Sequence, residues 1–170
     1  MKSPVYFIIL LLIIPVQASL LAPLSLGGIK PDLALVLIYI IGLLTGPAEA
    51  ALAGMVIGLV QDIGSGSFIG FSGLTRGLIG FSAGLLGRRV LDLTSRSNSL
   101  FLTAFSLLEG IFIAFFLQMF YGSVPFVSLM AGRILPQALY TGVLGAVLLK
   151  LIVRKDVMSL LVRRDVQKEF

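Results

Sequence analysis

The sequence predicts an all-α integral membrane protein with about six transmembrane helices. Of its 170 residues, 58% are hydrophobic and 12% are charged, and the mean hydropathy is +1.08. Charged residues make up about a quarter of ordinary soluble domains, so a water-soluble core does not explain this composition. At roughly 20 apolar residues per crossing, the length allows six spans with short connections and leaves no room for an extramembrane domain.

The N-terminal part of the sequence predicts two helices joined by a glycine- and proline-containing break. An apolar run from Val5 to about Leu26 is long enough to span a membrane. Residues 16–18 have the small-residue spacing of a signal-peptidase site, but the apolar character continues past them, so we favour an uncleaved helix. The stretch Gly27–Pro31 breaks the pattern. Asp32 then stands where it can cap a second helix that runs to Thr45.

The rest of the chain divides into four more apolar segments. They are a third helix from Gly46-Pro47 to about Gln61, a fourth from about Gly70 to Gly87, a fifth from about Leu100 to Tyr121, and a sixth from Phe126 or Arg133 to Val153. Pro136 marks either a kink or the true start of the sixth helix. The glycine-rich stretch from Asp62 to Phe68 is interpreted as a loop. The second and third helices are short for a full crossing, so we expect them to stand upright or to end in a protein-lined cavity.

Lys and Arg residues are distributed asymmetrically, which predicts the orientation. With both termini cytoplasmic, the outer side keeps Lys30 and Arg133, and the basic residues on the inner side are Lys2, Arg88, Arg89, Arg96, Lys150, Arg154, Lys155, Arg163, Arg164 and Lys168. This imbalance follows the positive-inside rule and favours an even number of spans. Residues 1–153 then form one transmembrane domain, and residues 154–170 form a basic amphipathic tail on the anionic inner leaflet.

The composition excludes most catalytic chemistry. The sequence has no Cys and no His, so thiol nucleophiles, imidazole bases and the usual zinc ligands are absent. No phosphate-binding loop of the GxxxxGK type occurs. We therefore expect no enzyme activity, no cofactor and no metal site. A net charge of +5 is compatible with nucleic-acid binding, but the basic residues lie at the ends of apolar runs, where they act as topology signals instead.

Glycines form a smooth stripe along the predicted fourth helix. They recur at alternating steps of three and four residues, at Gly70, Gly73, Gly77, Gly80, Gly84 and Gly87, and a similar stripe on the third helix consists of Ala50, Gly54 and Gly58. Small residues let two helix backbones approach closely in lipid. We predict that the two stripes face each other inside the protein, and a face for a partner helix is the alternative.

Two ionisable residues are predicted to lie at membrane depth, Arg76 in the fourth helix and Glu109 in the fifth. Either would be costly if it faced lipid. Their depths differ by roughly 7 Å in antiparallel helices with a rise of about 1.5 Å per residue, so we predict that they pair or share a polar cavity. A structural pair and a transport or ligand site both stay open. Asp62 is interpreted as a solvated acid at the outer boundary, with a contact for a cation or a partner's basic group as the alternative.

Two short strings of residues are specific enough to compare with known families. The first is Lys30-Pro31-Asp32-Leu33 before an apolar helix, and the second is Gly58-Leu59-Val60-Gln61-Asp62, continuing through Gly66 to Gly70-Phe71. In order and spacing they resemble the MreD family of rod shape-determining proteins. The positions that match the family motif are Pro31, Asp32, Asp62, Gly66 and Gly70. The resemblance also covers the chain length, the basic connection after the fourth helix and the Pro136-containing last helix.

This resemblance implies a non-enzymatic subunit of the bacterial cell-elongation complex in the inner membrane. Members of the family bind the bitopic protein MreC, whose periplasmic part engages the penicillin-binding transpeptidase paired with RodA, and MreB filaments lie on the cytoplasmic side. The resemblance thus implies a scaffold that binds MreC and supports peptidoglycan synthesis and the regulation of cell shape. We expect the small-residue faces of the third and fourth helices to contribute to that contact.

The resemblance leaves a second function open. The fold of the family is similar to that of the substrate-binding subunits of energy-coupling-factor vitamin transporters, so a vitamin-binding membrane subunit is the alternative. The Pro31-Asp32 and Gln61-Asp62 strings favour the shape-determining protein. A secondary transporter is disfavoured because the sequence shows no inverted repeat.

Overall fold

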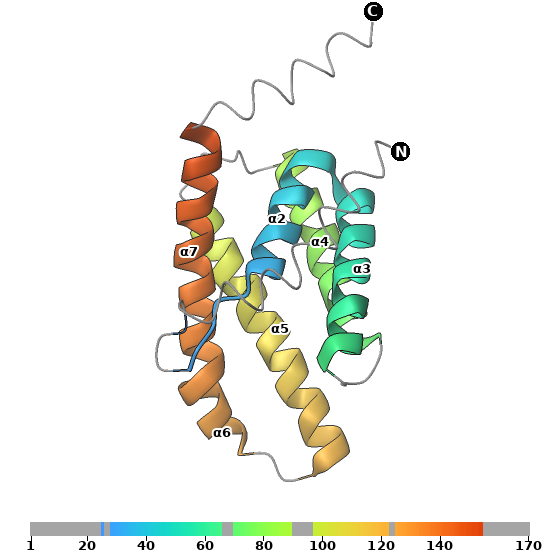
Figure 1. Cartoon of the computed structure of the whole chain (residues 1–170), viewed down its shortest axis with the longest axis vertical. Coiled ribbons are helices and arrows are strands. Elements are labelled where there is room, and N and C mark those ends of the chain that lie inside the picture. The colour runs from blue at the N-terminus through green and yellow to red at the C-terminus, as the bar shows by residue number, and fades with distance from the viewer. Residues whose placement is uncertain (1–24, 26–27, 66–69, 90–96, 123–124, 155–170) are drawn as a thin grey trace, which may run out of the picture.

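The protein is an all-helical bundle in a computed structural model that describes residues 25, 28–65, 70–89, 97–122 and 125–154 (Figure 1). Its elements are α2 (Leu33–Thr45), α3 (Pro47–Ser65), α4 (Phe71–Arg89), α5 (Ser97–Tyr121), α6 (Phe126–Leu129), the π-helical turn η1 (Met130–Ile134) and α7 (Leu135–Arg154). No strand occurs within these ranges. The predicted helix from Val5 and the predicted tail after Arg154 lie outside the described residues.

The short helix α2 lies at the centre of the bundle. Seven of its 13 residues are buried, namely Ala34, Leu35, Val36, Ile38, Tyr39, Ile40 and Gly42. A helix that is apolar on all sides needs other helices around it, and α2 contacts α3, α4, α5 and α7. Its side chains form the main core cluster with Ile79, Ala83, Leu102 and Leu149 from α4, α5 and α7.

Both ends of α2 are set by the residues that the sequence predicted. Asp32 is the N-cap, and its Oδ1 atom accepts a hydrogen bond from Leu35 N at 3.0 Å, which satisfies one of the free donors of the first turn. Gly46 ends the helix with a φ of 111°, a conformation that glycine adopts without strain. The turn into α3 lies at the upper end of the bundle, together with the last turns of α4 and α7 (Figure 1).

Helices α3 and α4 form the closest helix pair. The glycines at which an added Cβ would meet the facing helix are Gly54 and Gly58 on α3 and Gly73, Gly77, Gly80 and Gly84 on α4. At Gly58, for example, a Cβ would overlap the backbone of Ser72 and Gly73. The two small-residue stripes therefore lie against each other within the chain, and the close approach of the backbones depends on them.

Helix α3 is longer than the sequence indicated. It continues through Ser65, so the prediction of a loop from Asp62 onwards is wrong for Asp62 to Ser65, whereas residues 66–69 lie outside the described residues. A glycine inside a helix costs only about 1 kcal/mol. That cost is comparable with the roughly 0.5–2 kcal/mol that a helix cap contributes, and Asp62 provides such a cap, as described below.

The last helical segment runs without interruption from Phe126 to Arg154 and contains a π-helical turn. This turn, η1, comes directly before the turn that holds Pro136. Pro136 has no N–H, and its ring displaces the carbonyl group of residue i−4, which is consistent with a wider turn at this position. Of the two predicted starts, Phe126 is the one observed. Pro136 marks a change in helix geometry and not the beginning of a helix.

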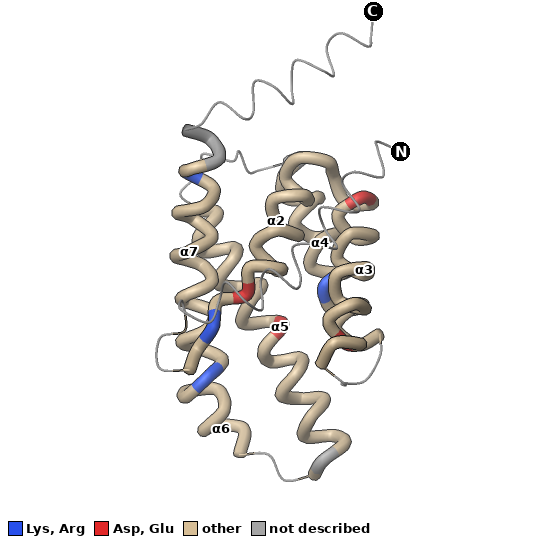
Figure 2. The backbone as a smooth tube through the Cα atoms, viewed as in Figure 1, with Lys and Arg blue, Asp and Glu red and all other residues tan. Residues whose placement is uncertain are grey.

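Three segments are long and apolar enough to cross a membrane, judged by length and composition: Pro47–Ser65, Ser97–Phe120 and Phe126–Leu151. Large apolar side chains point outward from them, and Leu52 and Phe115 are 63% and 65% exposed. Charged residues are sparse along the described backbone (Figure 2). An apolar surface of this extent is suited to lipid and not to water, so the protein is a transmembrane protein.

Candidate functional site

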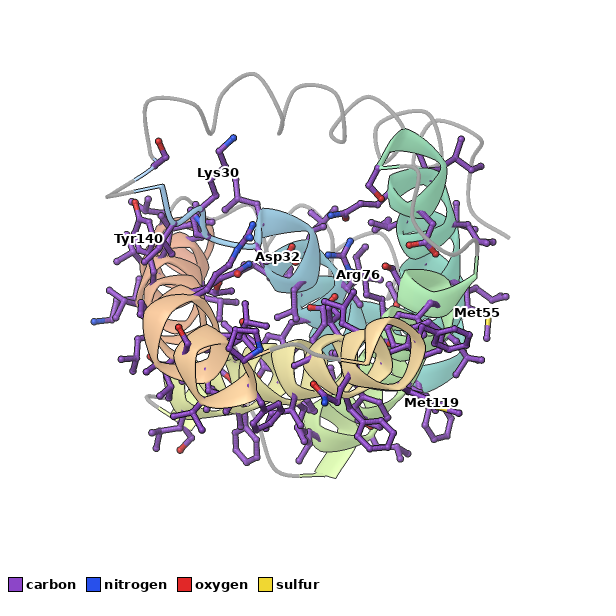
Figure 3. The ribbon with its side chains drawn as sticks, turned by 90° about the horizontal axis from the view of Figure 1, so that it is seen from below. Lys30, Asp32, Met55, Arg76, Met119 and Tyr140 are labelled. Atoms are coloured by element: carbon purple, nitrogen blue, oxygen red, sulfur yellow. The ribbon has the colours of Figure 1, made fainter. Side chains whose placement is uncertain are left out.

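Arg76 is buried inside the bundle at the centre of a polar cluster (Figure 3). Its Nε atom donates to Glu109 Oε1 at 2.8 Å, and its Nη2 atom donates to Asp32 Oδ2 at 2.6 Å. The Nη1 atom donates to Gln61 Oε1. One guanidinium group thus connects α4 with α3, with α5 and with the N-cap of α2. We call Asp32, Gln61, Arg76 and Glu109 the Arg76 cluster.

The side chains of the Arg76 cluster that carry charge are largely buried. The Arg76 side chain is 3% exposed, and those of Asp32 and Glu109 are 13% and 7% exposed. A buried charge is tolerated only when it is paired and hydrogen-bonded. In the described ranges no fully buried side-chain nitrogen or oxygen lacks a hydrogen-bond partner. Arginine can make these three contacts because its planar guanidinium group holds its N–H donors in fixed directions, whereas the ammonium group of lysine does not.

The same region also ties α2 to α7. The backbone N–H of Asp32 donates to Thr141 Oγ1 at 3.0 Å, and the Thr141 hydroxyl in turn donates to the Gln137 carbonyl at 2.8 Å. Thr141 is fully buried. The first turn of α2 is therefore fixed by α4 from one side and by α7 from the other.

Asp62 is a fully buried cap and not a solvated loop acid. Its exposed fraction is 0%, and Oδ2 accepts hydrogen bonds from Gly70 N at 2.9 Å and Ser72 N at 3.1 Å. These N–H groups belong to the start of α4, where free donors and the positive end of the helix dipole favour a carboxylate. Gly70 has a φ of 99°, which glycine adopts readily. The sequence-based interpretation of Asp62 as a solvated acid is thus wrong, and the residues that donate hydrogen bonds to it lie eight and ten positions further along the chain.

Between α4 and α5 lies a groove, because these two helices make few direct contacts. The part of the groove that includes Gly70 has a volume of about 510 Å³, and the part that includes Leu86 has a volume of about 490 Å³. Both parts share Ser82, Phe105 and Leu108. The apolar walls consist chiefly of Leu74, Leu78, Leu85, Leu108, Phe112 and Phe116. We call this feature the α4–α5 groove. It follows α4 from Gly70 to Leu86, which is about 24 Å at 1.5 Å per residue.

Few polar side chains reach the α4–α5 groove. They are Thr75, Ser82 and Glu109. The hydroxyl groups of Thr75 and Ser82 donate to carbonyl groups of their own helix, Phe71 O and Leu78 O. Glu109 therefore links the groove to the Arg76 cluster. In the described part of the chain, no three acidic residues gather in a way that would hold a metal ion.

The comparison with family models decides the family. The model described as rod shape-determining protein MreD matches residues 2–159. The chain belongs to the MreD family. Membership implies a role in rod shape determination. Comparisons with curated proteins and with solved structures return no match.

The residues that suggested MreD come together in three dimensions. Asp32, from the first string, and Gln61, from the second, both contact Arg76. Asp62 and Gly70 are joined by a hydrogen bond at the start of α4, and Pro31 is fully buried beside Asp32. Gly66 lies outside the described residues. The MreD strings thus surround the buried end of α2 and the start of α4.

Arg76 and Glu109, which were predicted to pair, are in contact. Asp32 and Gln61 are further partners of Arg76 that were not predicted. A signal for Gln61 was available. Gln61 follows Gly58 by three residues and Arg76 follows Gly73 by three residues, so each lies on the glycine-bearing face of its helix. The contact with Asp32 had no comparable signal, because it depends on α2 beginning inside the bundle.

Proposed function

We propose that this MreD-family protein is a non-enzymatic scaffold subunit of the bacterial cell-elongation complex, and that it binds the transmembrane helix of MreC in the α4–α5 groove. The observation that carries the proposal is the groove itself. Leu74, Leu78 and Phe112 are 61%, 56% and 52% exposed along its walls. Through this contact the scaffold would support peptidoglycan synthesis and cell shape.

The groove supports a partner contact better than the glycine faces do. Gly54, Gly58, Gly80 and Gly84 pack against the backbone of the facing helix within this chain. Another helix would have to displace α3 from α4 to reach them. The α4–α5 groove requires no such rearrangement, so we place the MreC helix there and assign the glycines to internal packing.

The dimensions of the groove suit a membrane helix. Its length of about 24 Å corresponds to roughly 16 residues of α-helix and is close to the thickness of about 30 Å of the hydrocarbon core. Its walls are leucine and phenylalanine side chains, which offer van der Waals contact to another apolar helix. A compact polar ligand would leave most of this length unfilled.

We further propose six crossings, with α2 and α4 counted as spans and one crossing before α2. Both termini then lie in the cytoplasm, at the end of the bundle where α4 and α7 finish with Arg89 and Arg154. The complex would lie in the bacterial inner membrane, with RodA, the penicillin-binding transpeptidase and MreB in the same assembly. The positive-inside rule supports this orientation.

The family match supports the scaffold over a vitamin-binding subunit of an energy-coupling-factor transporter. Small-molecule sites combine an apolar cavity with several convergent polar groups. Of the polar side chains in the groove, Thr75 and Ser82 already donate to their own helix. Tight binding of a vitamin by the purified protein would nevertheless contradict the scaffold assignment.

Co-purification of MreC with variants of this protein tests the proposal. Ser82 lies where the two parts of the groove join, so Ser82→Phe fills the groove with an aromatic ring. Ser128→Phe, the same change at an exposed position of α6, is the matched control. We expect Ser82→Phe to lose MreC and rod shape while Ser128→Phe retains both. Retention of MreC by Ser82→Phe, or normal rod shape after depletion of the protein, would rule the proposal out.

A further inference from the structure

The carboxylate group of Glu109, which lines the α4–α5 groove, has one oxygen without a hydrogen-bond partner among the described residues. Glu109 is 5% exposed, and its Oε1 atom accepts the hydrogen bond from Arg76 Nε. The other oxygen, Oε2, accepts no hydrogen bond from any residue that the structure describes. Every fully buried side-chain oxygen in these ranges has a partner, so Oε2 is not sealed in the core. Glu109 lines the α4–α5 groove, so we take the groove as the space that Oε2 faces.

The Arg76 cluster has more carboxylate groups than cationic groups, so Oε2 is left as an acceptor for a further donor. The Arg76 cluster sets two carboxylates, Asp32 and Glu109, against one guanidinium group. Asp32 has a second donor in Leu35 N, at the positive end of α2. Glu109 has Arg76 alone among the described residues. In a site of low dielectric constant, an acceptor without a donor is unfavourable and attracts a donor more strongly than in water.

We propose that the helix that occupies the α4–α5 groove carries a basic side chain, which donates a hydrogen bond to Glu109 Oε2 and cannot accept one. This inference rests on the proposed scaffold function, with MreC as the partner. It specifies the feature by which the groove recognises the partner helix. Apolar contact along the walls holds many helices equally well, whereas a donor at the level of Glu109 fixes which helix binds and in which register.

The depth of Glu109 favours a transmembrane helix over a lipid as the source of the donor. Glu109 is the thirteenth of the 25 residues of α5, about 18 Å from either end at 1.5 Å per residue. Lipid headgroups remain at the surface of a hydrocarbon core about 30 Å thick, so they do not reach this level. Acyl chains do reach it but carry no donor. A side chain on a transmembrane helix reaches this level and brings the donor.

The experiment compares Glu109→Gln with Glu49→Gln. The glutamine at position 109 keeps a carbonyl oxygen for Arg76 and turns an amide donor towards the groove, which replaces the free acceptor by a donor. Glu49 is exposed in the first turn of α3, outside the groove, and undergoes the same chemical change. We expect Glu109→Gln to retain MreC at least about fivefold less than the wild type, the scale of one interhelical hydrogen bond in a membrane. We expect Glu49→Gln to retain it fully.

A second arm acts on the partner and does not depend on how Glu109→Gln folds. Each basic residue in the transmembrane helix of MreC is replaced by leucine, and retention on the wild-type protein is measured. One replacement near the middle of that helix is expected to reduce retention as much as Glu109→Gln does. Combining the two changes should give no further loss, because both remove the same bond.

Three outcomes would overturn the inference. The first is that Glu109→Gln retains as much MreC as the wild-type protein does. If Ser82→Phe still loses MreC in that case, the proposed scaffold function stands and the proposed donor is excluded. The second is a partner helix in which no replacement of a basic residue matters. The third is labelling of the groove by a photoreactive phospholipid that excess MreC does not compete away, which would assign the groove to lipid. If the wild-type protein retains no MreC at all, it is the proposed function that fails.

Discussion

The Nη2 atom of Arg76 lies 2.6 Å from Oδ2 of Asp32, so a side chain of α4 holds the first turn of α2. Asp32 uses its other carboxylate oxygen, Oδ1, to cap that turn at Leu35 N. The start of the central helix and the position of α4 are therefore fixed by one carboxylate. Because α4 forms one wall of the α4–α5 groove, the Arg76 cluster also fixes the shape of the proposed binding surface.

Arg76→Ala should destabilise the protein by about 3–5 kcal/mol, because it leaves two buried carboxylates without their shared cation. Thermal unfolding of the protein in detergent, followed by loss of helical signal, measures the change. Arg133→Ala is the control. Arg133 is exposed in η1, and we expect its removal to change stability by no more than about 0.5 kcal/mol.

A double-mutant cycle isolates the contact between Arg76 and Glu109. The combined variant, with both residues changed to alanine, should be more stable than the sum of the two single losses predicts. The coupling free energy expected for residues in direct contact is about 0.5–3 kcal/mol. Strictly additive losses would show that the two side chains do not interact in the folded protein.

Asp62→Ala should cost about 0.5–2 kcal/mol, the range for loss of a helix cap. The variant leaves Gly70 N and Ser72 N without their acceptor at the start of α4. Asp62→Asn keeps one acceptor oxygen, so we expect a smaller loss. Glu49→Ala, an exposed acid on the same helix, is the comparison. If thermal unfolding shows equal effects for Asp62→Ala and Glu49→Ala, Asp62 does not act as a cap.

Two glycines of α3 test the close packing against α4. Gly58→Ala places a Cβ on the backbone of Ser72 and Gly73, whereas Gly64→Ala places one in open space. We expect the first to destabilise by about 1–3 kcal/mol through overpacking. The second should be neutral or stabilising by up to about 1 kcal/mol, through helix propensity. Similar unfolding temperatures for the two variants would argue against the α3–α4 interface.

The absence of cysteine from the sequence allows a direct test of orientation. Ser128→Cys, exposed on α6, and Glu49→Cys, exposed at the opposite end of the bundle on α3, each introduce a single thiol. With cytoplasmic termini, a membrane-impermeant maleimide should label position 128 in intact cells and position 49 only after lysis. The reverse labelling pattern would invert the proposed topology.

Local signals in the sequence predicted much of the helix layout. Asp32 and Gly46 delimit α2, and the predicted fourth and fifth helices match α4 and α5 to within about three residues. These boundaries follow from capping and from breaks in the apolar pattern, which are properties of neighbouring residues. The stripes of small residues likewise predicted which faces of α3 and α4 meet.

Features that depend on distant residues were not predictable in this way. The end of α3 was placed too early because its glycines resemble a loop, whereas Asp62 is held by the start of α4. The contact between Arg76 and Asp32 requires the first turn of α2 to lie inside the bundle. The α4–α5 groove arises because two helices stay apart, and no pattern within either helix shows that.

Photocrosslinking in living cells tests most directly whether the α4–α5 groove receives MreC. A photoreactive residue is placed in turn at Leu78 and Phe112 in the groove, and at Leu52 and Val143, which are 63% and 61% exposed on α3 and α7. We predict strong crosslinks to the transmembrane helix of MreC from the two groove positions and weak ones from the other two. Crosslinks to MreC from Leu52 or Val143, with none from the groove, would contradict the account.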